Sequence, residues 1–214
     1  FGTRRHAKIV YNSPASIAFG SGGGDSAFSV SIWAKVNPDI LSTTQPGRLF
    51  EFGTGGAGYA YRANIDKDGN VQFSLKILGG AGTKFFTTTL SNFRTDYAGW
   101  NHYVFAYNGD ESSTDVKIYV NGESTSVTTT SAGTYTGMGA GGLDFFIGAH
   151  FNEQNQWNGF ISQVAIFNSQ ISQENARAIY EGTSIGSYQD KTTYFSGKLS
   201  NPAKDVVRTL DARI

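Results

Sequence analysis

The chain has 214 residues with 17 basic and 17 acidic side chains, a net charge of +0 and no cysteine. The charge balance excludes an electrostatic footprint for nucleic acid, and the absence of cysteine excludes disulfides and thiolate metal sites. No apolar run reaches the length of a membrane span, so membrane insertion is not expected. With 27 Gly, 16 Phe and 11 Tyr, the composition favours many short strands and tight turns.

Short strands separated by turn residues follow one another through most of the chain. Phe28–Val36 alternates apolar and polar residues, and Trp100–Tyr107 alternates in the same way, which predicts strands with one buried face. Asp66–Asn70 and Asn121–Gly122 carry the residues of tight β-hairpin turns. About a dozen such strands, with no internal repeat, predict an all-β sandwich or jelly roll.

The segment Phe160–Phe167 is apolar on both alternating faces, which is typical of a strand covered on both sides. Regular alternation predicts one face with Val164 and Ile166, and another with Ile161, Ala165 and Phe167. We therefore expect this strand to be buried within the fold.

One short helix is predicted immediately after this strand. Ser172 offers an N-cap side chain for a helix over residues Gln173 to Tyr180. Gly182 ends the helix, because glycine readily adopts the left-handed backbone that follows a helical C-terminus. A buried strand followed by one short helix, late in a chain of strands, supports the predicted sandwich.

The ends of the chain differ in composition from its middle. Residues 1–14 start with several basic side chains and are predicted to form a solvated or partner-docked arm. Residues 15–182 form the predicted sandwich domain. Residues 183–214 are polar, and they either add a strand to the sandwich or form an arm that becomes ordered against a partner. Because the chain begins at Phe1 and its only methionine is Met138, we expect a processed product or part of a longer polypeptide.

Five strings, in order along the chain, resemble one protein family. They are FSVSIWAKV from Phe28, WNHYVFAYNG from Trp100, KIYVNG from Lys117, FIGA from Phe146 and WNGFISQVAIFNSQISQENARAIY from Trp157. Over roughly residues 15–182 they are similar to the laminin G-like branch of the concanavalin A-like lectin/glucanase superfamily, which includes pentraxin-like modules. The resemblance implies a jelly-roll β-sandwich of two curved antiparallel sheets, with a concave face and ligand-binding loops at one rim. It also implies carbohydrate or protein partners, often with a calcium ion.

The sequence departs from the family pattern at a place where relatives often have an acidic residue. Ser162-Gln163 occupies that place, and calcium prefers charged oxygen ligands. Asp25, in the first loop, is the remaining carboxylate near the expected site, and a lone carboxylate is more often a loop residue. The carboxylates within Asp66–Asn70 are explained by the predicted hairpin. We therefore predict no metal site and no cofactor, with calcium left open as the alternative.

Enzymes of this superfamily carry closely spaced carboxylates on one face of a strand, where they act as acid and nucleophile on a glycosidic bond. In this chain the only acidic residues spaced two apart are Asp66 and Asp68, which lie in a turn. His6, His102 and His150 lack the spacing of a metal site. A non-catalytic protein is predicted, with a glycoside hydrolase built from distant carboxylates as the remote alternative.

A loop rich in amides is the candidate ligand site. Sugars bind through planar amides that form paired hydrogen bonds and through aromatic rings on which the sugar stacks. The predicted glycan-binding residues of this loop are Asn152, Gln154, Asn155, Gln156 and Trp157. A core or hinge role is the alternative for Trp157. Trp33, on the polar face of its strand, is a second candidate unless a covering loop buries it.

The leading hypothesis is a non-catalytic, lectin-like recognition or adhesion module that binds carbohydrate and is displayed on a larger extracellular or virion assembly. The alternative is a purely structural decoration or scaffold protein of a virus particle or surface layer, which the arm and the C-terminal extension would suit. Expected partners are carbohydrate or other protein chains of that assembly, and not nucleic acid. Homo-oligomerisation is left open.

Overall fold

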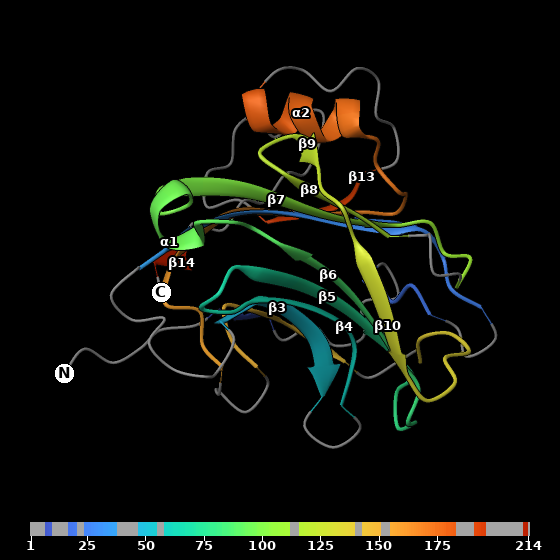
Figure 1. Cartoon of the computed structure of the whole chain (residues 1–214). Coiled ribbons are helices and arrows are strands. Elements are labelled where there is room, and N and C mark those ends of the chain that lie inside the picture. The colour runs from blue at the N-terminus through green and yellow to red at the C-terminus, as the bar shows by residue number, and fades with distance from the viewer. Residues whose placement is uncertain are drawn as a thin grey trace.

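The computed structural model describes residues 7–9, 17–20, 24–37, 47–54, 58–111, 116–139, 143–150, 155–182, 191–195 and 212–213. Two antiparallel sheets of seven strands each lie face to face, and one helix lies on the outer face of the second sheet (Figure 1). The predicted all-β jelly-roll sandwich is confirmed.

The first sheet has the strand order β1-β11-β3-β4-β5-β6-β10. Its strands are β1 (Ala7–Ile9), β3 (Gly47–Thr54), β4 (Gly58–Ile65), β5 (Asn70–Lys76), β6 (Thr83–Thr89), β10 (Thr128–Ala132) and β11 (Asp144–Ile147). The second sheet has the order β13-β12-β2-β7-β8-β9, and β14 also pairs with β12. Its strands are β2 (Phe28–Val36), β7 (Trp100–Tyr107), β8 (Val116–Val120), β9 (Glu123–Ser124), β12 (Gly159–Phe167), β13 (Lys191–Phe195) and β14 (Ala212–Arg213).

The core between the sheets is built from the apolar faces of alternating strands. Every second residue of β2 from Phe28 onward is buried, and the odd-numbered residues of β7 from Tyr103 onward are buried beside them, as alternation predicted. Aromatic contacts cross between the sheets, and the ring of Phe28 lies 4.7 Å from that of Tyr61 in β4, centroid to centroid. Burying one such ring contributes about 1.5–3 kcal/mol, so these contacts hold the two sheets together.

Both predicted hairpin turns are confirmed. The turn between β4 and β5 is held by the Asp66 carboxylate, which accepts hydrogen bonds from the backbone N–H groups of Asp68 and Asn70 at 2.9 and 3.0 Å. The turn thereby accounts for this Asp- and Asn-rich pattern. Asn121 and Gly122 have φ angles of 51° and 80°, the left-handed backbone that a two-residue type I′ turn requires between β8 and β9.

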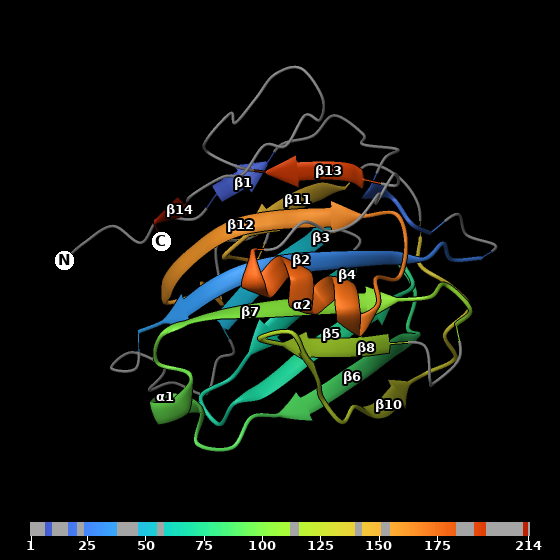
Figure 2. The same cartoon turned by 90° about the horizontal axis from the view of Figure 1, so that it is seen from above.

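Helix α2 (Gln173–Glu181) covers the outer face of the second sheet and lies across β2 and β7 (Figure 2). It begins at the predicted N-cap, where the Ser172 hydroxyl accepts a hydrogen bond from the Asn175 N–H at 3.3 Å, and it ends at Gly182. Its buried residue Ala176 and its half-buried Ile179 pack on a small outer cluster formed by Val104, Ala106, Tyr119, Ala165, Phe167 and Ile171. The single helical turn α1 (Phe93–Asp96) was not predicted.

Strand β12 departs from regular alternation at its centre. Its register against β2 shifts between Ser162 and Ala165, and Gln163 lies in this β-bulge with a φ of 49°. Beyond the bulge the two faces of the strand exchange, so Ile161 packs into the inter-sheet core on the same side as Val164. The prediction that Ile161 faces away from Val164 was wrong, because one extra residue in the strand reverses the alternation.

Strands from both ends of the chain join the sheets. β1 pairs with β11 at the edge of the first sheet, and β13 and β14 pair with β12 in the second. For residues 191–195 and 212–213, the alternative of an added strand is the one observed. The rest of 183–214 lies outside the described residues, and the division of the chain at residues 14 and 182 stays a prediction.

Candidate functional site

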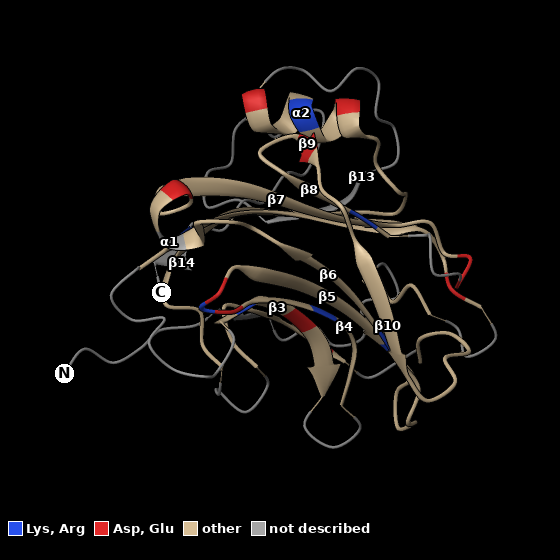
Figure 3. Cartoon of the chain, viewed as in Figure 1, with Lys and Arg blue, Asp and Glu red and all other residues tan. Residues whose placement is uncertain are grey.

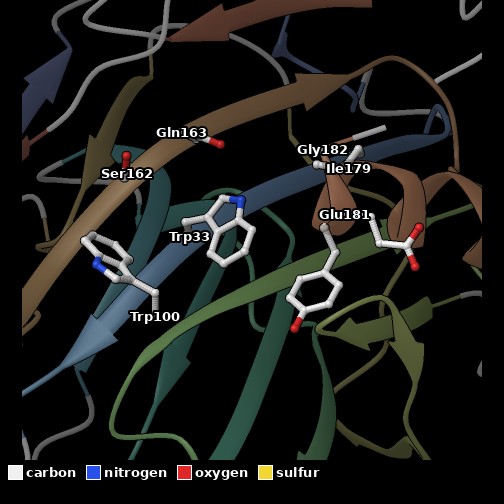
Figure 4. A pocket seen from close by; sticks show the side chains of 8 residues that line it. Trp33, Trp100, Ser162, Gln163, Ile179, Glu181 and Gly182 are labelled. Atoms are coloured by element: carbon white, nitrogen blue, oxygen red, sulfur yellow. The ribbon is translucent and has the colours of Figure 1, made fainter. Parts of the chain in front are cut away.

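A pocket of about 470 Å³ opens on the outer face of the second sheet, at the C-terminal end of α2 (Figure 4). It is lined by Trp33, Trp100, Ser162, Gln163, Ile179, Tyr180, Glu181 and Gly182. The lining thus comes from β2, β7, β12 and α2, which are far apart in the sequence. Its size is that of a site for a small-molecule ligand, and it mixes aromatic with polar side chains.

The register of the second sheet brings the strand residues of the pocket together. Two neighbouring rows across the sheet are Ser162–Trp33–His102 and Phe160–Lys35–Trp100. Because successive side chains on a strand point to opposite faces, the members of these two rows share the outer face. The apolar residues under α2 belong to rows further along the sheet. The C-terminal end of α2 therefore lies next to the two rows that contain Trp33 and Trp100.

The β-bulge in β12 adds a polar side chain to the site. Ser162 and Gln163 are consecutive residues, yet both line the pocket. In an unbroken strand Gln163 would point into the core, where an unpaired amide costs about 1–3 kcal/mol. Bulges often occur beside functional sites because they redirect one side chain, and this one places an amide next to the aromatic rings.

Aromatic rings form the floor and one end of the pocket. The rings of Trp33 and Tyr180 are stacked, with centroids 5.7 Å apart and planes 19° apart. Trp100 lies next to Trp33 in the pocket (Figure 4). In the described part of the chain, the large hydrophobic side chains that are exposed are Trp100 (45%), Phe160 (41%) and Tyr180 (39%). All three lie in or beside this pocket. Such a concentration of exposed apolar side chains is typical of interaction sites.

The polar groups of the pocket have unused hydrogen-bonding capacity. The Trp33 Nε1–H is buried and has no hydrogen-bond partner among the described residues. Gln163 and Glu181 are exposed, and neither pairs with another side chain within the described ranges. Gln163 offers a ligand an amide that both donates and accepts, and Glu181 offers a carboxylate that accepts. These groups are suited to a ligand that carries hydroxyl groups.

His102 lies next to Trp33 in the same row of the second sheet and is fully buried. Its ring centroid lies 5.2 Å from that of Trp33 and 6.4 Å from that of Tyr180, and its Nε2 lies 2.7 Å from the Ser31 hydroxyl. Burial away from water lowers the pKa of His102 from 6.5 to about 4. The imidazole is therefore neutral at pH 7 and acts as part of the packing.

We expect the free energy of unfolding to decrease as the pH is lowered from 6.5 to about 4. In that range His102 takes a proton in the unfolded chain but not in the folded one, which favours unfolding by about 1.4 kcal/mol per pH unit. Urea unfolding of the wild type and of His102→Gln at pH 7 and pH 5 measures this, because the variant lacks the titrating ring. An equal pH dependence of the two proteins would contradict the burial of a neutral histidine.

The predicted glycan loop is described only in part, and its described residues Asn155, Gln156 and Trp157 do not line this pocket. Asn152 and Gln154 fall outside the described residues. Asn155 and Gln156 are half-buried, and the Asn155 carbonyl accepts a hydrogen bond from the Arg48 N–H of β3 at 2.8 Å. A role of these amides in sugar binding stays a prediction.

Trp157 has the core position that was its alternative. It is 2% exposed, and its indole N–H donates a hydrogen bond to the Lys35 carbonyl at 3.2 Å. The ring therefore presents no open face on which a sugar could stack. Trp33, the second candidate, is half-buried and lines the pocket. Sequence reasoning did not single out Trp100 or Tyr180, although alternation already placed Trp100 opposite the core face of its strand.

The loop carboxylate considered for calcium has a structural role. Asp25 accepts hydrogen bonds from the hydroxyl groups of Tyr107 and Tyr135 and from the backbone N–H of Met138. These bonds tie the first loop to β7 and to the segment before β11. Within the described residues, no group of three or more His, Cys, Asp or Glu side chains is placed to hold a metal ion.

Charged residues of both signs occur on the described elements (Figure 3). Lys, Arg, Asp and Glu are scattered, and both signs occur on α2 (Figure 3). No helix in the described part of the chain is long and apolar enough to cross a membrane.

Two face-to-face antiparallel sheets with a ligand-sized pocket define the class of the protein as a jelly-roll β-sandwich domain. The sequence profile of the concanavalin A-like lectin/glucanases superfamily matches residues 12–177. The chain therefore belongs to the concanavalin A-like lectin/glucanases superfamily, as the resemblance implied. Among curated proteins, no sequence matches the chain.

Solved structures share the fold at low sequence identity. A native heptameric SAP-like pentraxin from Limulus polyphemus is 16% identical with a TM-score of 0.51, and the match covers 83% of each chain. The binding domain of Paraclostridial Mosquitocidal Protein 1 is 17% identical with a TM-score of 0.52, covering 80% of this chain and 40% of that one. The binding domain of Botulinum Neurotoxin serotype G is 14% identical with a TM-score of 0.51, covering 78% and 38%. At these identities the likeness concerns the fold alone.

Proposed function

We propose that this chain is a non-catalytic, lectin-like recognition module that binds carbohydrate in the pocket at the end of α2. The observation that carries the proposal is the gathering of exposed aromatic rings and unpaired polar groups in one pocket. A sugar has an apolar C–H face that stacks on an aromatic ring and a rim of hydroxyl groups that need donors and acceptors. Membership of the lectin/glucanases superfamily supports this function.

Each side chain of the pocket has a distinct role in the proposed site. Trp100 supplies the exposed face on which the sugar stacks, and Trp33 with Tyr180 forms the floor. The Gln163 amide forms paired hydrogen bonds with neighbouring hydroxyls, and Glu181 accepts at the rim. The non-catalytic assignment is supported by the lining, in which Glu181 is the one carboxylate among the described residues, whereas glycoside hydrolysis needs two.

We further propose that the module is displayed on a larger extracellular or virion assembly, where it contacts glycans or other protein chains. The two similar toxin structures are themselves binding domains of longer chains, which is compatible with such an appended role. A structural decoration without a soluble ligand is the competing function.

A glycan array, probed with the purified domain in calcium and again in chelator, tests the proposal. We expect specific binding that is the same in both conditions. Trp100→Ala should weaken the affinity for the bound glycan by about 10- to 100-fold, since it removes about 1.5–3 kcal/mol of aromatic contact. Gln163→Ala should weaken it by about 10-fold through the lost hydrogen bonds.

Two control variants outside the pocket test whether the loss of binding is specific to the pocket residues. Gln72→Ala removes the same amide from β5 in the first sheet and should leave binding unchanged. Trp157→Phe tests the amide loop, and a folded Trp157→Phe protein should bind as the wild type does. Absence of binding across the array by the folded wild type would reject the lectin function and favour the structural decoration.

A further inference from the structure

The aromatic surface continues past the edge of the pocket. The ring of Phe160 lies 6.3 Å from that of Trp100, centroid to centroid, and their planes are 48° apart. Phe160 is 41% exposed but does not line the pocket, whereas Trp100 does. We call the pair of Trp100 and Phe160 the outer platform, and the pair of Trp33 and Tyr180 the inner platform. The two platforms share the outer face of the second sheet.

The spacing of the platforms follows from strand geometry. Trp33 and Lys35 are two residues apart on β2, so the two rows of side chains lie about 7 Å apart along the strands. Within the outer row, Phe160 and Trp100 stand on strands that flank β2, and Lys35 lies between them. Lys35 is half-buried, and its ammonium group forms no ion pair within the described residues. It can therefore donate hydrogen bonds to a ligand that crosses this row.

Resting on the proposed function, we propose that the ligand is an extended oligosaccharide, which runs from the inner platform to the outer platform. A single pyranose ring is about as large as one aromatic side chain, so it covers one platform at a time. A chain of sugars stacks on both, and each additional aromatic contact adds to the affinity.

The exposure of Phe160 outside the pocket also favours a chain of sugars over a single sugar as the ligand. A monosaccharide site needs one ring with polar groups around it, which the pocket already provides. Phe160 on the outer face of the sheet is 41% exposed, so it gains only part of the roughly 1.5–3 kcal/mol that full burial of such a ring contributes. A longer ligand that covers Phe160 recovers the rest of that energy on binding.

Isothermal titration of the intact chain with sugars of increasing length tests the inference. The probes are the β-1,4-linked dimers and hexamers of glucose, N-acetylglucosamine and mannose, because equatorial linkages keep these chains extended. In the series that binds, the hexamer should bind at least about 10-fold more tightly than the dimer. Phe160→Ala should weaken hexamer binding by about 5- to 10-fold and leave dimer binding unchanged, whereas Trp100→Ala should weaken both.

The outcomes separate this inference from the proposed function. Equal affinities for dimer and hexamer, or hexamer binding that is unaffected by Phe160→Ala, would overturn the extended ligand and leave the lectin function standing. Binding of branched or single sugars on the array with no binding of any hexamer would overturn it as well. If the folded wild type binds no glycan at all, both ideas fail. Thermal unfolding of Phe160→Ala checks that the variant folds, as expected for a ring that is 41% exposed.

Discussion

Trp157→Ala is expected to lower the free energy of unfolding by about 3–5 kcal/mol, because it empties a large volume in the core between the sheets. The Trp157 ring is 2% exposed and donates a hydrogen bond to the Lys35 carbonyl of β2. Gly47 of β3 leaves space for the same ring, since a Cβ at that position would lie 2.8 Å from a ring carbon. Trp157 thus joins strands of both sheets. Urea unfolding followed by circular dichroism measures the loss.

Trp100→Ala is the matched control, because it removes the same side chain from a position that is 45% exposed. This variant should change the free energy of unfolding by about 0.5 kcal/mol or less, although it weakens glycan binding. Trp157→Ala should therefore lower stability, whereas Trp100→Ala should weaken binding and leave stability nearly unchanged. Equal destabilisation by the two variants would show that the assigned burial of Trp157 is wrong.

A buried ion pair lies on the opposite side of the molecule, in the first sheet. Arg48 and Glu51 of β3 are 2% and 0% exposed, and the Arg48 Nε lies 3.5 Å from a Glu51 carboxylate oxygen. His150 approaches the other oxygen at 3.6 Å. Burial, followed by the nearby charge of Arg62, lowers the pKa of Arg48 from 12.5 to about 10. The guanidinium is still charged at pH 7 and depends on Glu51 for compensation.

Glu51→Gln is expected to lower the free energy of unfolding by about 3–5 kcal/mol, since it leaves the buried Arg48 charge beside Arg62 without its carboxylate. Glutamine keeps the size of the side chain and changes only its charge. Chemical unfolding at pH 7 therefore measures the effect of the lost charge.

Glu123→Gln provides the comparison, because Glu123 and Arg177 form an ion pair with side chains that are 63% and 48% exposed. Loss of such a surface pair should cost about 0–1 kcal/mol. A Glu51→Gln protein as stable as Glu123→Gln would mean that water reaches the Arg48 cluster.

Several features of the fold could be predicted because they depend on local chemistry. The strands β2 and β7 have a strict two-residue period, and that period already separates core residues from outward ones. The ends of α2 could be predicted because Ser172 and Gly182 are capping residues that act on their own neighbours. The short helical turn α1 has no such cap hydrogen bond, and it was missed.

The candidate site was only partly predictable. Trp33 was recognised as an outward tryptophan, but the sequence does not reveal whether a covering segment buries such a ring. Gln163 could not be placed, because regular alternation points it into the core and only the bulge turns it outward. The amide loop was predicted to bind glycan from its composition alone. Trp157 beside it proved to be a core residue, since a side chain that is large and aromatic suits either role.

The sequence by itself determined the fold class, the alternating faces of the main strands, the hairpin turns and the limits of the helix, because each of these depends on residues within a few positions of one another. The tertiary structure decided which aromatic rings are buried and which are open, where β12 shifts its register, and that Trp33, Trp100, Gln163 and Tyr180 form one pocket. These outcomes depend on strand pairing between residues that are distant in the chain. Such pairing is selected by the packing of the whole core, and no local pattern encodes it.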